Sequence, residues 1–374
     1  MSRQILLVRA SGTPEEIGKA HGVDAKADVI ANRDLYFRRF KEEWGLDRAV
    51  VLERAGAYES VVQGQAPDYM EAMEGLSDGS RVPLEEIVAL NVRYEIVYSE
   101  YSRRGRVDEI AKLPSGCTAL GLLPSRTAGG RLLLAQNWDW ISGVRPILVE
   151  GRVRDGQAFL GFTEAGIVGA KVGLNAAGIG LAINGLVSDR DAWDLKGLPF
   201  HVRCWRALQA RTLDEAERAV RQEPSSCSAN FLLGQAVDGG GRLVDVETSP
   251  AGSVCIEPED GVLTHANHFH CADDLGVGEP LLDERTSTFL REARMQSLLR
   301  DTSDRKVRIE DVAAFLRDHE GHPNSICRHP DPQQSEAGRY ETVVSVVLDL
   351  GAGELRISSG NPCAAEYRTF SLHP

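Results

Sequence analysis

The sequence changes character at residues 114–137, PSGCTALGLLPSRTAGGRLLLAQN. Before this stretch, residues 102–112 are charged and poor in apolar side chains, a composition typical of an exposed loop. After it, short apolar runs alternate with glycine-containing turns such as residues 127–130, a pattern typical of strands joined by hairpins. We therefore predict a structural boundary here, with Cys117 at the start of the first strand of a β-rich part.

Downstream of this boundary, several expected strands are apolar on both faces, so both faces need a cover. The expected strands are residues 132–137, 159–163, 168–174, 179–184, 231–237, 243–247 and 342–348. Helical periodicity returns in residues 202–211, 213–221, 286–299 and 309–319, which could supply those covers. The pattern favours sheets sandwiched between helices.

Upstream of the boundary, the first 110 residues are expected to be mostly helical. Thr13 to Glu16 form a capping box with proline at the first helical position, and the helix is expected to stop near Gly22. A second helical stretch spans residues 24–44, and Pro67 and Pro83 each open another. No strand-like alternation is evident in this part, so we expect no strand there.

Composition and charge narrow the classes of function. The 374 residues carry a net charge of −13, the wrong sign for a protein that tracks a nucleic-acid backbone. The longest apolar runs are far shorter than the roughly 20 residues of a transmembrane helix, and the N-terminus lacks the apolar region of a secretory signal. We therefore expect no nucleic acid or membrane partner and a cytoplasmic location. Gly-rich pieces at residues 75–79 and 239–241 do not fit a phosphate-binding loop.

Seven cysteines, an odd number with no CxxC pair, leave at least one thiol free. Cys117 stands out because it follows a charged loop and Gly116 at a loop-to-strand junction, where side chains are displayed. The alternative is that Cys117 is a small buried core residue, the usual state of a free cysteine.

The segment around Cys117 is accompanied by further motifs in a recognisable order. They are Ser115-Gly116-Cys117-Thr118, Gln136-Asn137-Trp138-Asp139-Trp140, Gly180-Leu181-Ala182-Ile183-Asn184-Gly185 and Thr264-His265-Ala266-Asn267-His268-Phe269, with Leu90 to Ile96 upstream and Ser325 to His329 near the end. This set resembles the isopenicillin-N acyltransferase family, relatives of choloylglycine hydrolase among the N-terminal-nucleophile hydrolases. The resemblance covers roughly residues 10 to 370. It implies an α+β fold, a four-layer αββα sandwich preceded by a mostly helical N-terminal segment.

The resemblance also implies that the chain cuts itself between Gly116 and Cys117. Residues 1–116 would then be a helical α fragment and residues 117–374 a catalytic β fragment, together one intimate αβ heterodimer that could assemble further. The thiol of Cys117 would attack the preceding carbonyl, where glycine offers no Cβ to resist the approach. The freed α-amine, with a pKa of about 7.7 to 8.0, can act as general base for its own thiol, so no cofactor or metal is required.

Three further residues match catalytic positions of the family. Asp139 matches the aspartate that orients the free amine, and its two neighbouring tryptophans are expected to exclude water. Asn184 matches the asparagine that stabilises the oxyanion, although Asn-Gly is also a strong hairpin signal. Asn267 matches a second asparagine that bonds the amine or the oxyanion, and the alternative for it is a buried polar strand residue.

Four residues are carried over as possible substrate or support groups. Arg328, with Ser325, could neutralise a carboxylate in the finished site, but both lie near Pro323 and Pro330 and could simply be surface loop residues. Arg93 and Glu95 match a family motif before the cut, and a structural ion pair is the equal alternative.

A histidine-rich segment is a candidate for a zinc site. His265, His268, His270 and Cys271, with Cys327 and His329, offer zinc-ligand types, but the spacing fits no standard zinc motif. In a strand, His268 and His270 would share one face and His265 would point to the other. We therefore expect no metal here.

Three functions remain open from the sequence. The first is a self-processing amidohydrolase or acyltransferase that works through an acyl-Cys117 thioester on a small-molecule amide or acyl-CoA. Amide hydrolysis is slightly favoured, because no basic run beyond residues 103–106 advertises a site for the phosphates of CoA. The second is an uncut thiol hydrolase in which His265 or His268 activates Cys117, and the third is a non-catalytic family member.

Overall fold

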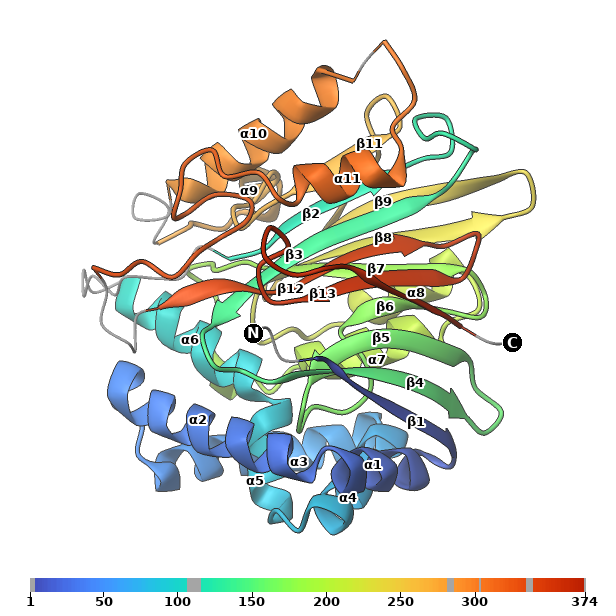
Figure 1. Ribbon diagram of the computed structural model, residues 1–374. Helices are drawn as coiled ribbons and strands as arrows, with labels where there is room; N and C mark the ends of the chain where they lie inside the picture. The colour runs from blue at the N-terminus through green and yellow to red at the C-terminus, as the bar shows by residue number, and fades with distance from the viewer. Residues whose placement is uncertain (1–3, 106–115, 281–285, 303, 334–338, 373–374) are drawn as a thin grey trace.

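The computed structural model describes residues 4–105, 116–280, 286–302, 304–333 and 339–372, and it contains two large sheets (Figure 1). The eight-stranded sheet has the order β1-β4-β5-β6-β7-β8-β9-β10 and the six-stranded sheet the order β11-β2-β3-β12-β13-β14. All neighbouring strands pair antiparallel except β1 and β4, which are parallel. The strands are β1 (Leu6–Gly12), β2 (Thr118–Leu122), β3 (Leu133–Ile141), β4 (Pro146–Val153), β5 (Ala158–Glu164), β6 (Val172–Asn175), β7 (Ile179–Gly185), β8 (Ala229–Val237), β9 (Gly240–Ser249), β10 (Gly252–Ile256), β11 (Val262–His265), β12 (Tyr340–Asp349), β13 (Glu354–Ser359) and β14 (Arg368–Ser371).

Helices cover the outer faces of both sheets, so the predicted four-layer αββα sandwich is confirmed. On one side α10 and α11 lie over the six-stranded sheet, at the top of Figure 1, and on the other side α7 and α8 pack against β5 to β9. The two sheets touch each other through β2, β3 and β11 on one side and β7, β8 and β9 on the other. The helices of the β-rich part are α7 (Phe200–Gln209), α8 (Leu213–Val220), α9 (Ala272–Leu275), α10 (Ser287–Arg300) and α11 (Ile309–Phe315), with a 3₁₀ turn, η1, at Trp193–Leu195.

Strand alternation explains why these layers form. In β2, Leu120 and Leu122 belong to an apolar cluster with Met295 of α10 and Phe315 of α11, whereas Ala119 belongs to the core between the sheets. Successive side chains of a strand point to opposite faces, so a strand that is apolar throughout fills two cores at once. The prediction that strands apolar on both faces are covered on both faces is therefore confirmed.

The N-terminal helices lie together at the bottom of Figure 1, beside β1 and β4. They are α1 (Pro14–Asp24), α2 (Lys26–Trp44), α3 (Arg48–Gln65), α4 (Pro67–Ser80), α5 (Leu84–Asn91) and α6 (Arg93–Gly105). The capping box at Thr13 is present. Helices α1 and α4 cross closely because glycines face each other: a Cβ at Gly18 would overlap the Ala72 carbonyl oxygen, and one at Gly75 would overlap that of Glu15. The glycines of residues 75–79 therefore serve packing.

Several predicted boundaries were wrong. Residues 6–12 form β1, because this short apolar run finds its partner β4 far along the chain, which local alternation does not reveal. The expected loop at residues 102–112 begins as the last turn of α6, and residues 106–115 lie outside the described residues. Strand β3 continues through Ile141, where we had ended it at Asn137, and β6 begins at Val172, where we had begun it at Val168.

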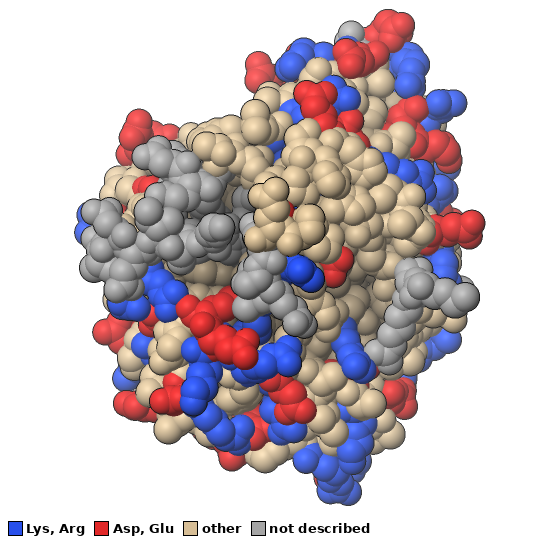
Figure 2. All heavy atoms as spheres, turned by 60° about the vertical axis from the view of Figure 1, so that its left-hand side comes forward, with Lys and Arg blue, Asp and Glu red and all other residues tan. Residues whose placement is uncertain are grey.

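Acidic and basic side chains are interspersed on the face that Figure 2 shows, with tan surface between them. Within the described residues, no helix is both long enough and apolar enough to cross a membrane.

Candidate active site

Cys117 directly precedes β2 and lines a small cavity. The cavity is bounded by β3, β7 and α6, and its lining residues are Arg93, Tyr94, Tyr98, Gly116, Cys117, Trp138, Asp139, Trp140, Lys171, Ile183, Gly185, Phe200 and Asn267. Cys117 is only 5% exposed, so it is buried as the core interpretation required, yet it faces a cavity that also contains charged groups.

Three side chains hold the backbone on both sides of the Gly116–Cys117 peptide bond. The Asn267 side-chain oxygen accepts the Gly116 N–H at 3.0 Å, and the Asn184 amide donates to the Cys117 carbonyl oxygen at 3.1 Å. Arg291 of α10 donates to the same carbonyl oxygen at 2.7 Å and also to Thr118 Oγ1 and Asn267 Oδ1. The structure thus brings the predicted Gly116, Cys117, Asn184 and Asn267 together.

Asn184 lies within β7, paired with Asn230 of β8, so the hairpin-turn interpretation is wrong. Its amide nitrogen donates to the Cys117 and His265 carbonyl oxygens, which engages both N–H groups in the intact chain. A role as oxyanion donor therefore stays a prediction and requires one of these contacts to be exchanged.

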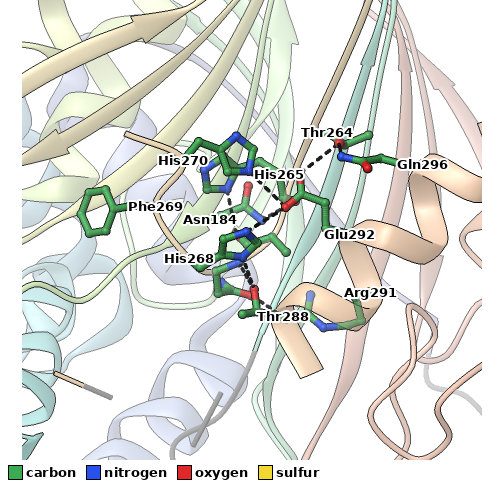
Figure 3. A network of polar contacts seen from close by, with 12 residues as sticks. Asn184, Thr264, His265, His268, Phe269, His270, Thr288, Arg291, Glu292 and Gln296 are labelled. Atoms are coloured by element: carbon green, nitrogen blue, oxygen red, sulfur yellow. Dashed lines mark hydrogen bonds and ion pairs between the residues drawn. The ribbon is translucent and has the colours of Figure 1, made fainter. Parts of the chain in front are cut away.

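Asn267 lies in the histidine-rich segment, whose histidines Figure 3 shows gathered around Glu292 of α10. The Asn267 N–H donates to Thr288 Oγ1 at 2.6 Å, and its side-chain amide donates to the Gly185 carbonyl oxygen. The chain leaves the strand at His265, so Asn267 is not a strand residue and the expected alternation of the histidines is wrong. The rings of His265 and His270 instead stack 4.5 Å apart.

His265 is a buried cation in this segment. One ring nitrogen faces the Ala266 carbonyl oxygen at 2.9 Å and the other faces a Glu247 carboxylate oxygen at 2.9 Å. Both neighbours only accept, so both ring nitrogens must carry hydrogen. Although burial acts in the opposite direction, Asp245 and Glu247 raise the pKa of His265 to about 9. The ring has no lone pair for a metal or for the Cys117 proton.

Asp139 is fully buried, and its carboxylate accepts from Thr342 Oγ1 of β12 at 2.7 Å. Burial raises the pKa of Asp139 to about 7, against the lowering effect of Arg291 and Arg328. Trp138 contacts Phe162 in the other sheet, and Asp139, one residue on, points to the opposite face. The expectation that both indoles frame the carboxylate is therefore wrong, since the pleat separates them.

Lys171 is a buried amine of the cavity that the sequence analysis missed, and burial lowers its pKa to about 7. Its Nζ lies 3.4 Å from the Trp138 ring centre and pairs with Glu164, which also pairs with Arg93. Burial and the charge of Asp139 raise the pKa of the Cys117 thiol to about 12, whereas the positive charges of Arg291 and Lys171 act to lower it. A lone lysine in an otherwise apolar run was the available signal, because lysine is almost never fully buried without a partner.

Arg291 was missed as well. It lies on the stripe of α10 that also carries Thr288, Met295 and Leu299, all buried. This spacing of three, four and four residues is the buried face of a helix, so a polar group there needed an explanation.

Arg93 and Glu95 do not pair with each other, because residues two apart in a helix do not face one another. Arg93 lines the cavity, pairs with Glu164 and stacks 4.9 Å from the ring centres of Tyr36 and Trp140. Glu95 accepts the Phe200 N–H at the start of α7, at 2.6 Å. The predicted ion pair between Arg93 and Glu95 is therefore wrong, and only Arg93 reaches the cavity.

Ser325 and Arg328 are buried, so their interpretation as surface loop residues is wrong. Ser325 donates to the Cys327 carbonyl oxygen and supports the loop. The Arg328 charge acts on Asp139, and the Arg328 N–H donates to Thr342 Oγ1, the hydroxyl that donates to Asp139.

Side chains of ligand type converge in three sets among the described residues: Glu247, His265 and His270; His268, His270 and Glu292; and His319, Cys327, His329 and Cys363. The first two share the histidine-rich segment and its carboxylates. The third lies apart from the cavity.

Comparison with known proteins places this chain in a family. The model of the acyl-coenzyme A:6-aminopenicillanic acid acyl-transferase family matches residues 125–364, more than half of the chain. A curated relative, the 40 kDa form of acyl-coenzyme A:6-aminopenicillanic-acid-acyltransferase from Emericella nidulans, is 29% identical over 363 residues, covering 96% of this chain and 93% of the relative.

Solved structures are similar at lower sequence identity. Penicillin V acylase from Agrobacterium tumefaciens aligns with a TM-score of 0.45 at 15% identity, over 68% of this chain and 85% of that one. The Caenorhabditis elegans ortholog of N-acylethanolamine-hydrolyzing acid amidase aligns with a TM-score of 0.43 at 15% identity, over 63% of this chain and 93% of that one. The family model, together with the relative that spans nearly the whole chain, shows that this protein belongs to the acyl-coenzyme A:6-aminopenicillanic acid acyl-transferase family.

Proposed function

We propose that the protein is a self-processing cysteine enzyme that cuts its own chain between Gly116 and Cys117 and then cleaves or transfers acyl groups through Cys117. The observation that carries the proposal is the set of hydrogen bonds on both sides of this one peptide bond. Asn267 binds Gly116, while Asn184 and Arg291 bind the Cys117 carbonyl, so the bond lies fixed beside a cavity in the protein interior. Residues 1–116 and 117–374 would become the two subunits of a heterodimer.

The cut would proceed in two steps. The Cys117 thiol loses its proton and attacks the Gly116 carbonyl carbon, the C–N bond breaks, and the Cys117 nitrogen takes up a proton to become a free amine. Water then hydrolyses the resulting thioester, which leaves a carboxylate on Gly116 and restores the thiol. A Cβ at Gly116 would lie 3.4 Å from the Asp139 carbonyl oxygen, an ordinary contact, so glycine is not demanded by space in the intact chain.

In the finished enzyme the new α-amine would take the proton of the Cys117 thiol. The thiolate would attack the acyl carbonyl of the substrate, and the amine or thiol of the substrate would leave with that proton. Water or an acceptor amine would then release the acyl group from the thioester. Asp139 would orient the amine, and Lys171 and Arg291 would supply positive charge that favours the thiolate.

The cavity lining favours an apolar acyl group. Tyr94 stacks on Tyr98 and on Phe200 with ring centres 3.9 and 4.1 Å apart, and Ile183 completes this wall. Arg93 lies in the same cavity and could bind a carboxylate on the other half of a substrate. We therefore propose a small-molecule amide, or an acyl-CoA of the kind named for the Emericella nidulans relative, as substrate.

The alternative of a histidine base has little support. Both ring nitrogens of His265 face acceptors, and His268 is engaged by Thr288 and Glu292. Within the described residues, no histidine is seen to hydrogen-bond the Cys117 thiol.

The test of the proposal is the covalent state of the purified full-length protein and of a Cys117→Ala variant. We expect the parent protein to give two bands, the larger beginning CTALGLL, and the variant to stay a single chain. A panel of N-acyl amino acids, acyl-lactams and acyl-CoAs then identifies the substrate class. Acyl release by the uncut variant at the parental rate would refute the proposal.

A further inference from the structure

Four metal-ligand side chains from three separate segments converge beside the sandwich. His319 follows α11, Cys327 and His329 lie in the loop before β12, and Cys363 lies between β13 and β14. One ligand atom from each lies within 4.8 Å of the others. Residues brought together from so far apart in the sequence leave no spacing motif, which is why the sequence grouped Cys327 and His329 with the wrong histidines.

The distances from His329 Nε2 to the other three ligand atoms match those around a tetrahedral zinc ion. His329 Nε2 lies 3.1 Å from His319 Nε2, 3.6 Å from Cys327 Sγ and 3.4 Å from Cys363 Sγ. Zinc binds nitrogen at about 2.0–2.1 Å and sulfur at about 2.3 Å, so tetrahedral ligands are separated by roughly 3.3 Å for two nitrogens and roughly 3.6 Å for nitrogen and sulfur. The three separations agree with these values to within about 0.3 Å.

The polar neighbours of His329 also favour a bound cation. His329 Nε2 faces another imidazole nitrogen and two sulfurs, and a single ring nitrogen has only one hydrogen or one lone pair to share among these three neighbours. This differs from His265, whose two ring nitrogens each face an oxygen acceptor. A cation at the centre would use the lone pairs of all four ligand atoms at once.

Cys327 also has the surroundings of a metal thiolate. Its sulfur accepts from the Asn361 side-chain amide at 3.8 Å and from the backbone N–H of Cys363. Donors of this kind stabilise charge on a ligating sulfur and hold it in place. Cys327 is buried, His329 is half-buried, and His319 and Cys363 are exposed, so a metal ion can enter from solvent.

We propose that His319, Cys327, His329 and Cys363 bind one zinc ion as a closed, structural Cys₂His₂ site. The ion would tie the end of α11 to the loop before β12 and to the segment between β13 and β14. Arg328 lies between two of the ligands, its carbonyl oxygen accepts from the Thr342 N–H and from the Asn361 amide, and its N–H donates to Thr342 Oγ1. The site would therefore hold the loop that presents Arg328 to Asp139.

The test is the zinc content of tag-free, full-length protein prepared under reducing conditions and dialysed against a weak chelator. We expect about one zinc per chain, and a loss of at least tenfold in zinc affinity for Cys363→Ser and for His319→Ala, whose exposed positions leave the fold intact. His322→Ala, next to the cluster, and Cys255→Ser, a cysteine elsewhere, should keep the parental zinc content. Substitution by Co²⁺ should give thiolate charge-transfer and tetrahedral d–d bands in the parent protein, and these should be lost in Cys363→Ser.

Three results would overturn the proposal: parent protein without zinc, equal zinc in the ligand and control variants, or a Cys327–Cys363 disulfide in the reduced preparation. None of these readouts depends on Cys117, so the zinc site and the proposed catalysis can fail separately.

Discussion

Cys117 and Cys327 are both buried thiols, and burial raises the pKa of each to about 12, yet their neighbours differ in kind. Cys117 is surrounded by a lysine, an arginine and two asparagines that hold its backbone. Cys327 is surrounded by imidazoles and a second thiol. Burial therefore does not distinguish the proposed nucleophile from the proposed ligand. The donors and acceptors around the sulfur do.

The largest expected effect distinguishes Cys117 from Cys255, a thiol that belongs neither to the cavity nor to the histidine–cysteine cluster. Cys117→Ala should abolish self-cleavage and lower acyl-group release by at least about 10³-fold, because it removes the nucleophile of both reactions. Cys255→Ser should leave both at parental levels. Gel analysis and single-turnover assays measure these effects, and equal losses in the two variants would break the comparison.

Arg291 is the next group that the comparison singles out, since it donates to the Cys117 carbonyl, Thr118 and Asn267. Arg291→Met should slow self-cleavage by about 10²-fold, because Arg291 holds the Cys117 carbonyl next to the bond being cut and a misplacement of about 1 Å at a reacting bond can cost this much. Arg291→Lys retains the charge without the forked geometry, so its rate of self-cleavage should lie between those of the parent protein and Arg291→Met. The rate of appearance of the N-terminus at Cys117 is the measurement, and parental rates in Arg291→Met would remove this residue from the mechanism.

Asp139 gives the cysteine centre a pH dependence. Burial raises the pKa of Asp139 from 3.8 to about 7, so the folded chain keeps a proton that the unfolded chain releases within this window. The folded state therefore loses stability as pH rises from about 4 to 7. In a Cys117→Ala background, Asp139→Asn should add about 2 kcal/mol to the free energy of unfolding at pH 8, with about 4 kcal/mol as the upper bound, and much less at pH 5.

Urea denaturation of both proteins at the two pH values measures this difference. The same gain at pH 5 and pH 8 would show that Asp139 does not titrate in this window.

The smallest effect concerns Lys171. Lys171→Met removes one of the two cations that favour the Cys117 thiolate and should slow self-cleavage roughly tenfold at neutral pH, one unit of thiol pKa. The loss should shrink as pH rises, because burial lowers the pKa of Lys171 to about 7 and its amine then loses the charge that favours the thiolate. A deficit that is constant from pH 7 to pH 9 would instead indicate a packing role for Lys171.

Patterns of neighbouring residues predicted much of this molecule. All-apolar strands such as β2 required covers on both faces, and α10 and α11 provide one of them. The motifs around Cys117, Asn184 and Asn267 led to three residues that meet at one peptide bond. The strand pattern lay within a few residues of sequence, whereas the site residues came from the family resemblance carried by several motifs in order.

Contacts between distant segments could not be predicted in this way. Strand β1 pairs with β4 some 140 residues later, and Arg291 reaches Cys117 although the two residues lie 174 positions apart in the sequence. Cys327 meets Cys363 and His319 only in the folded chain. The indoles beside Asp139 were misjudged because adjacency in a strand places side chains on opposite faces.

The most direct measurement of the central claim is the intact mass of the purified, catalytically active protein. The account predicts two polypeptides, residues 1–116 and 117–374, with a free amine and a free thiol on Cys117 of the second. A fully active sample consisting of one unbroken polypeptide would contradict it.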